Sequence, residues 1–154
     1  MGMVLSFTRV TPEALAKGLK DPEWTYEHLH EVEPTDDLDG YLDKAWAGIQ
    51  FLLDEEEVEI DLRMDGVAIG NEGALAGWSV DEVRYAARRL GELPFEQLAR
   101  HYDPEKLSAQ DVYPNIWLRD DDALDYLQYH YEVLVRFFAA AAASGSAAIM
   151  SFSY

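Results

Sequence analysis

Apolar residues recur at steps of three and four between Leu38 and Leu53, and this spacing predicts an amphipathic helix. Its apolar positions are Leu38, Tyr41, Leu42, Ala45, Trp46, Ile49, Leu52 and Leu53. The acidic run 54–57 would place four carboxylates at the negative end of the helix dipole, so we expect the helix to end near Leu53. From Val58 to Met64 apolar residues alternate instead, which predicts an exposed edge strand or an extended connector.

The N-terminal segment carries signals for a strand followed by helices. Residues 2–10 are apolar and partly β-branched, which predicts a strand. Thr11 followed by Pro12 is typical of a helix start, because the threonine side chain can cap the helix and proline suits its first turn. A second short helix is expected over residues 21–30.

Further along the chain, glycines at 66, 70, 73 and 77 predict a flexible loop. Ser79 and Glu82 have the spacing of a capping box and predict a helix that ends at Gly91. A long helix is expected over residues 120–143, with Gly145 just past its end. Residues 146–154 predict a closing strand.

These elements predict an α+β fold. Isolated strands are unstable, so we expect the two terminal strands to pair with each other. The predicted architecture is a mainly helical single domain over residues 1–154, with a small sheet formed by the N- and C-terminal strands and perhaps residues 58–64.

The charge is strongly acidic, with 30 acids against 12 bases and a net charge of −18. Residues 1–82 hold 20 of the acids and 5 of the bases. A field of this sign repels nucleic acid and anionic membranes, favours a monomer and attracts a basic protein or a cation. The chain has no cysteine, secretory signal or membrane span, so we expect a cytoplasmic protein without membrane or nucleic-acid partners.

Metal and catalytic motifs are weak. Asp61, Asp65, Gly66 and Glu72 occupy four positions of a calcium-binding loop, but Arg63 places a cation where a ligand belongs and Ile69 offers no side-chain oxygen. The aspartates at 120–122 and 125 are explained by a helix N-terminus, which acidic side chains stabilise. No metal, cofactor or catalytic residue is predicted, and an enzyme is the less favoured class.

Several short motifs, in order, resemble the YfbM-like family, a set of small bacterial proteins classed as a domain of unknown function (DUF1877). They are "LDKAWAGIQFLL", "AIGNEGALAG", "DVYPNIW" and "YEVLVRFFAAAAASGSAAIMSF". The most specific pieces are Asp43, Lys44 and Trp46 in the first motif and Tyr113–Pro114 in the third. The resemblance covers essentially the whole chain. It implies an α+β domain and supplies no catalytic residues.

Two hypotheses about function follow. The first is a non-enzymatic interaction protein whose acidic half engages a basic partner, in one version as an immunity protein against a basic toxin. The alternative is a small-ligand-binding protein or enzyme, with a pocket beside residues 70–78 and 113–117. Its expected ligand-binding residues are Asp43, Lys44, Trp78, Tyr113 and Trp117.

Overall fold

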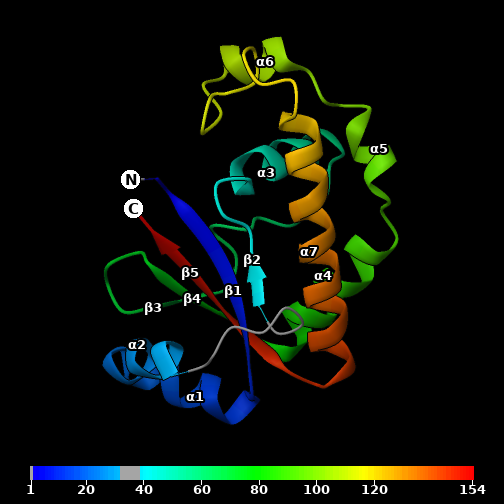
Figure 1. Ribbon diagram of the computed structural model, residues 1–154. Helices are drawn as coiled ribbons and strands as arrows, with labels where there is room; N and C mark the ends of the chain where they lie inside the picture. The colour runs from blue at the N-terminus through cyan, green and yellow to red at the C-terminus, as the bar shows by residue number, and fades with distance from the viewer. Residues whose placement is uncertain (1, 32–38) are drawn as a thin grey trace.

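A five-stranded antiparallel sheet organises the computed structural model, which describes residues 2–31 and 39–154 (Figure 1). The strand order is β2-β1-β5-β4-β3. The strands are β1 (Val4–Val10), β2 (Asp39–Tyr41), β3 (Val67–Ile69), β4 (Leu75–Trp78) and β5 (Ala147–Ser153). The two terminal strands pair along their full length, from Val4 opposite Ser153 to Val10 opposite Ala147. The predicted α+β class and the pairing of the terminal strands are therefore confirmed.

Helices cover both faces of the sheet (Figure 1). They are α1 (Pro12–Lys20), α2 (Pro22–Glu31), α3 (Trp46–Glu55), α4 (Val80–Gly91), α5 (Phe95–Ala99), α6 (Pro104–Ala109) and α7 (Ala123–Ala143). Alternate residues of a strand point to opposite faces, so β5 sends Met150 and Phe152 into the larger core and Ala147 and Ile149 into a smaller one. Among the described helices, none combines the length and apolar character needed to cross a membrane.

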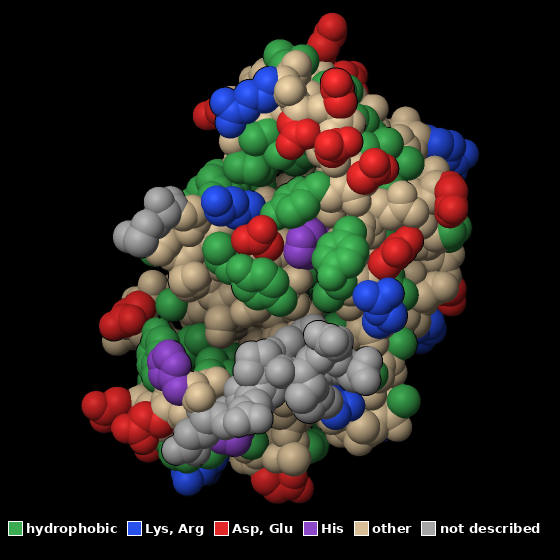
Figure 2. Space-filling view, in the orientation of Figure 1, with side chains coloured by type: hydrophobic (Ala, Val, Ile, Leu, Met, Phe, Trp, Pro, Cys, Tyr) green, Lys and Arg blue, Asp and Glu red, His purple; other side chains and the backbone are tan. Residues whose placement is uncertain are grey.

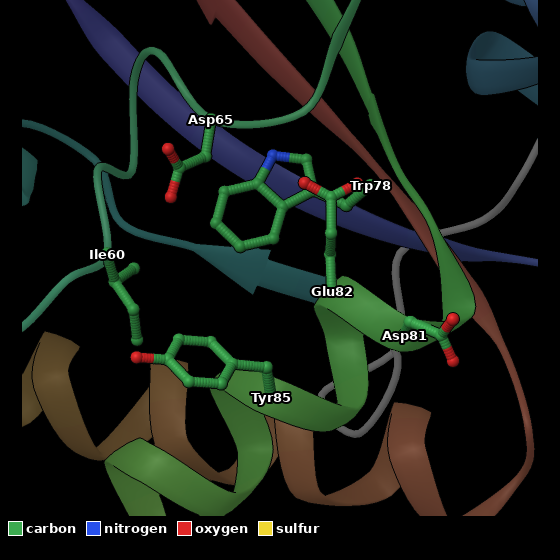
Figure 3. Close-up of a pocket in the computed structure, with 6 residues that line it drawn as sticks. All are labelled: Ile60, Asp65, Trp78, Asp81, Glu82 and Tyr85. Carbon is green, nitrogen blue, oxygen red and sulfur yellow. The ribbon is translucent and has the colours of Figure 1, made fainter.

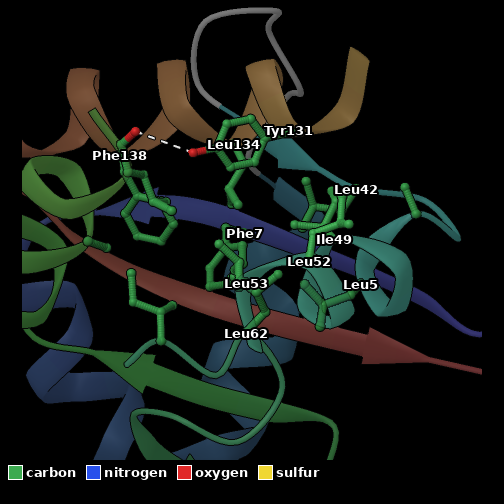
Figure 4. Close-up of a cluster of buried hydrophobic side chains, with 14 of the residues drawn as sticks. Leu5, Phe7, Leu42, Ile49, Leu52, Leu53, Leu62, Tyr131, Leu134 and Phe138 are labelled. Atoms are coloured by element: carbon green, nitrogen blue, oxygen red, sulfur yellow. Dashed lines mark hydrogen bonds between the residues drawn. The ribbon is translucent and has the colours of Figure 1, made fainter. Parts of the chain in front are cut away.

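The larger core is centred on α7, which packs against α3 and α4 (Figure 4). Phe138 of α7 meets Phe7 of β1 and Trp78 of β4, with ring centroids 5.2 and 5.4 Å away. The buried Tyr131 hydroxyl donates to the Leu93 carbonyl at 2.7 Å and so ties α7 to the segment after α4. The sheet and the helical layer thus share one aromatic centre.

The local signals at helix ends are confirmed. The Ala14 amide donates to the Thr11 side chain at 3.0 Å. Ser79 and Glu82 form both hydrogen bonds of the capping box. Gly145 adopts the left-handed conformation, with φ +67°, that terminates α7.

Of the two alternatives predicted for residues 58–64, the edge strand is wrong and the connector is correct. The predicted glycine loop instead forms the β3–β4 hairpin. Residues 58–64 bury Val58, Ile60 and Leu62, as their alternation suggested, but they have no strand partner. The Gln50 amide takes that place: it donates to the Ile60 carbonyl at 2.9 Å and accepts from the Leu62 amide at 2.8 Å. A side chain of α3 therefore satisfies backbone groups that would otherwise need a neighbouring strand.

The predicted helix from Leu38 to Leu53 is wrong at its start. Leu38 lies outside the described residues, and Tyr41 belongs to β2, where it pairs with Ser6. The helix begins at Trp46 and runs to Glu55. Acids are tolerated at its C-terminal end because Glu55 pairs with Lys106 and the Glu56 carboxylate lies 2.5 Å from the His101 ring.

Candidate functional site

The turn between β2 and α3 holds Asp43 in the left-handed region, with φ +51°, which is uncommon for a residue other than glycine. The Tyr126 hydroxyl donates to Asp43 Oδ2 at 2.7 Å and accepts from the Lys44 amide at 3.1 Å. The Tyr41 hydroxyl donates to Asp43 Oδ1 at 3.3 Å. Burial, together with the bond to Asp43, raises the pKa of Tyr126 well above its ordinary value, so the hydroxyl stays neutral. The turn is thereby fastened to α7.

Beside this turn lies a surface cavity of about 560 Å³, which we call the Lys44 pocket. Its lining residues are Lys44, Tyr113, Pro114, Ile116, Arg119, Asp120, Asp122 and Tyr126. The Tyr113 hydroxyl accepts from the Met3 amide at 2.9 Å, which anchors the connector before α7 to the start of β1. Within the described residues, Lys44 and Arg119 take part in no ion pair.

Aromatic side chains continue from this pocket across the neighbouring surface. Figure 2 shows hydrophobic side chains gathered around a histidine in the middle of this face. His130 is 8% exposed, and its ring meets those of Tyr126 and Tyr129 at 4.7 and 5.0 Å. Its Nδ1 lies 3.2 Å from the Tyr41 carbonyl, which can only accept, so Nδ1 carries the proton. Burial lowers the pKa of His130, so the ring is neutral at pH 7.

A second cavity, of about 320 Å³, lies between α4 and the loop before β3 (Figure 3). We call it the Trp78 pocket, and its lining residues are Ile60, Asp65, Trp78, Asp81, Glu82 and Tyr85. Trp78 is 2% exposed, and its Nε1–H has no hydrogen-bond acceptor within residues 2–31 and 39–154. Burial raises the pKa of Asp65, and the charges of Asp61 and Glu82 raise it further, although the Asp61 amide that donates to it acts in the opposite direction.

The structure places the five residues singled out from the sequence in three surroundings. Lys44 and Tyr113 line one pocket, and Asp43 is bonded to Tyr126 of the same pocket. Trp78 lines the other pocket. Trp117 is buried in the core, where its indole donates to the Val112 carbonyl at 2.8 Å.

The acids of the calcium-loop pattern have partners within the chain. Asp61 Oδ1 accepts from the amides of Arg63 and Met64, each at 3.0 Å, so this carboxylate stabilises a turn. Asp65 Oδ2 accepts from the Asp61 amide at 2.9 Å, and Glu72 accepts from the Tyr26 hydroxyl at 3.2 Å. Across the part of the chain that the structure describes, no group of three or more histidine, aspartate or glutamate side chains is arranged to hold a metal ion.

Comparison with known proteins assigns the family. Residues 1–151 match the family described as "Domain of unknown function (DUF1877)". The chain belongs to this family. The crystal structure of a protein of unknown function, YfbM from Escherichia coli, shares the fold, with a TM-score of 0.72 and 14% sequence identity. The superposition covers 97% of this chain and 99% of YfbM. No curated protein matches the chain.

Several pocket residues of this DUF1877 chain were missed in the sequence. Tyr126 and Arg119 join the Lys44 pocket, and Asp65, Glu82 and Tyr85 join the Trp78 pocket. Tyr126 lies 83 residues from Asp43, so no local spacing could have connected them. Glu82 could have been recognised only as a capping residue, because its spacing from Ser79 already explains it.

Proposed function

We propose that the protein binds a small zwitterionic molecule, one that carries an anionic and a cationic group, in the Lys44 pocket. The observation that supports it most is the pairing of charges around one cavity. Lys44 and Arg119 supply two positive charges, and Asp120 and Asp122 supply two negative ones. A volume of about 560 Å³ lies within the range typical of small-molecule sites.

The anionic group of the ligand would bind between the two cations. In a chain with a net charge of −18, two basic side chains without an ion pair among the described residues stand out. The Tyr113 oxygen accepts from Met3, so its own proton can be donated to a ligand oxygen. Hydrogen bonds between charged partners are about twice as strong as neutral ones, which favours a carboxylate at this place.

The cationic group would face Asp120 and Asp122, which are exposed at the start of α7. Asp120 Oδ1 already accepts from the Asp122 amide at 2.9 Å, so one oxygen of this carboxylate holds the turn and the other is available to a ligand. Between the two charged ends, Tyr113, Pro114, Ile116 and Tyr126 offer apolar surface. We propose binding rather than catalysis, because the Tyr126 hydroxyl is fully engaged by Asp43 and Lys44.

Thermal unfolding with a panel of amino acids tests this proposal. Each amino acid is compared with its methyl ester, which lacks the carboxylate, and with the matching carboxylic acid, which lacks the ammonium group. A zwitterion that binds is expected to raise the midpoint of thermal unfolding by roughly 3–6 °C when its concentration is about ten times its dissociation constant. The ester and the acid should raise it less.

Lys44→Gln and Arg119→Gln should each abolish most of this increase, whereas Arg84→Gln should leave it unchanged. Arg84 is an exposed cation on α4 and lines neither pocket, so it is the matched control. A panel without any stabilising zwitterion, or an ester that stabilises as well as its amino acid, would contradict the proposal.

The acidic surface supports a second proposal, that the protein engages a basic protein partner, of which an immunity-like complex is one form. Exposed acids occur on α1 and α2 and in the short turn between them: Glu13, Asp21, Glu23 and Glu27. Other acids gather at the start of α7, in the upper part of Figure 2. The acids at the end of α3 contribute less, because Glu55 and Glu56 have partners within the chain.

Affinity capture from native lysate tests the second proposal. We expect a basic protein to be retained at about 50 mM salt and released at about 1 M, where the Debye length is only ~3 Å. Retention should fall in Glu23→Gln/Glu27→Gln and persist in Glu92→Gln/Glu96→Gln, which removes two exposed acids from the other half of the chain. No basic protein at low salt, or equal retention by both variants, would count against it.

A further inference from the structure

Among the residues that the structure describes, the Trp78 indole N–H is a buried donor without an acceptor. The large majority of buried side-chain polar atoms in proteins have a hydrogen-bond partner, so such an exception needs an explanation. The ring lines a cavity of about 320 Å³ rather than being enclosed by core side chains alone. In Figure 3 its nitrogen lies on the ring edge between the side chains of Asp65 and Glu82. A ligand in this cavity could supply an acceptor once the neighbouring loop at Gly66 moves aside.

Two carboxylates share this cavity, and each has one oxygen in use. Asp65 Oδ2 accepts from the Asp61 amide at 2.9 Å, and Glu82 Oε1 accepts from the Ser79 amide at 3.0 Å. In the described residues, neither Asp65 nor Glu82 has a lysine, arginine or histidine partner. Two like charges near each other in a partly buried space repel, and a bound cation would relieve that repulsion.

The walls of the cavity also suit an organic cation. Trp78 and Tyr85 contribute aromatic rings, which attract ammonium groups through their negative faces, and Ile60 contributes apolar surface. No basic side chain lines the cavity. Calcium would need six to eight oxygen ligands, more than two partly engaged carboxylates offer. An ammonium group needs only a few acceptors and tolerates the aromatic wall.

We propose that the Trp78 pocket binds a small primary amine that carries an oxygen acceptor close to its ammonium group. The ammonium group donates to the available oxygens of Asp65 and Glu82, and the ligand oxygen accepts from Trp78 Nε1–H. The loop at Gly66 lies close beside the indole, where a Cβ would stand 3.1 Å from Nε1, so this loop moves aside to let the ligand oxygen reach the N–H. This site is separate from the Lys44 pocket and does not depend on it.

Nuclear magnetic resonance of the indole N–H groups tests the proposal directly. The chain has four tryptophans, and Trp78→Phe assigns the Trp78 indole signal. Ethanolamine, titrated at constant ionic strength, is expected to shift the Trp78 signal with a dissociation constant of about millimolar order, as befits a ligand of few atoms. Trp117, whose indole already donates to Val112, should not shift. Ethylamine should bind more weakly, and ethylene glycol should have no effect.

Three charge-removing variants distinguish ethanolamine binding in the Trp78 pocket from a general attraction of cations to this acidic protein. Asp65→Asn and Glu82→Gln keep an oxygen for the Asp61 and Ser79 amides, and each should weaken ethanolamine binding at least about tenfold. Glu92→Gln is the matched control, because Glu92 is exposed just after the end of α4 and does not line the Trp78 pocket.

The spectra of the three variants also report whether each is folded. An unchanged Trp78 signal at saturating ethanolamine would overturn the proposal. So would an equal response to ethylene glycol, or undiminished binding by folded Asp65→Asn and Glu82→Gln proteins. Thermal stabilisation by amino acids through Lys44 would be unaffected by any of these results, so the two sites can fail separately.

Discussion

Replacing Phe138 by alanine is expected to lower the free energy of unfolding by about 3–5 kcal/mol. The side chain is fully buried on α7, and its ring centroid lies 5.2 Å from that of Phe7, 5.4 Å from that of Trp78 and 5.2 Å from that of Phe137. Its removal leaves a cavity where the sheet and the helical layer meet, and rigid aromatic neighbours cannot collapse to fill it. Native domains have only about 5–15 kcal/mol of stability, so this loss is a large fraction.

Urea unfolding followed by circular dichroism measures the change, with Tyr129→Ala as the control. Tyr129 is on the same helix but is 62% exposed, so its truncation should change the free energy of unfolding by less than about 1 kcal/mol. Similar losses for the two variants would show that Phe138 does not occupy the centre of the core.

Replacing Gly48 by leucine is expected to cost about 2–3 kcal/mol through overpacking. Gly48 is buried on α3, and even a Cβ there would come within 2.7 Å of Leu127 and of the Trp117 ring. Both neighbours are buried, so neither can move away freely. Trp117 lies between Ile116 and Arg119, which both line the Lys44 pocket, so binding of a zwitterion there should weaken as well.

Gly91→Leu is the matched control, because a Cβ at Gly91 meets nothing within 4 Å. This residue ends α4, where a side chain improves helix propensity by up to about 1 kcal/mol relative to glycine. Urea unfolding of both variants should therefore give changes of opposite sign. A stabilised Gly48→Leu protein would mean that α3 does not approach α7 as closely as the structure indicates.

Features that depend on neighbouring residues were predictable from the sequence. The Thr11 cap, the Ser79–Glu82 capping box and the Gly145 terminator each act within a few residues, so their patterns carry the whole interaction. The pairing of the terminal strands was predictable for a different reason: an isolated strand is unstable and needs a partner.

Features that depend on distant partners were not predictable. Residues 58–64 alternate like a strand, but the Gln50 side chain satisfies their backbone, and sequence periodicity does not register such a partner. Tyr41 fits a helical stripe, yet it pairs with Ser6 at the edge of the sheet. Apolar spacing reports burial, and these two segments are examples in which burial was compatible with more than one backbone conformation.

The candidate site, too, was predictable only in part from the sequence. Lys44 and Tyr113 were singled out together and do line one pocket, but Trp78 lines another and Trp117 is in the core. An aromatic residue near the end of an element can lie in a pocket or in the core, and only its three-dimensional neighbours decide which.

The position of β5 in the sheet has a consequence for how the chain folds during synthesis. The strand formed by Ala147–Ser153 is the last to leave the ribosome, yet it is the middle strand and separates β1 from β4. Until it emerges, both neighbours expose unpaired edges, which are sites of aggregation. The contacts between β1 and β5 close a loop of nearly the whole chain and give the sheet a high contact order. Completion of the sheet is therefore a late step, whereas α1, α4 and α7 can form earlier from local contacts.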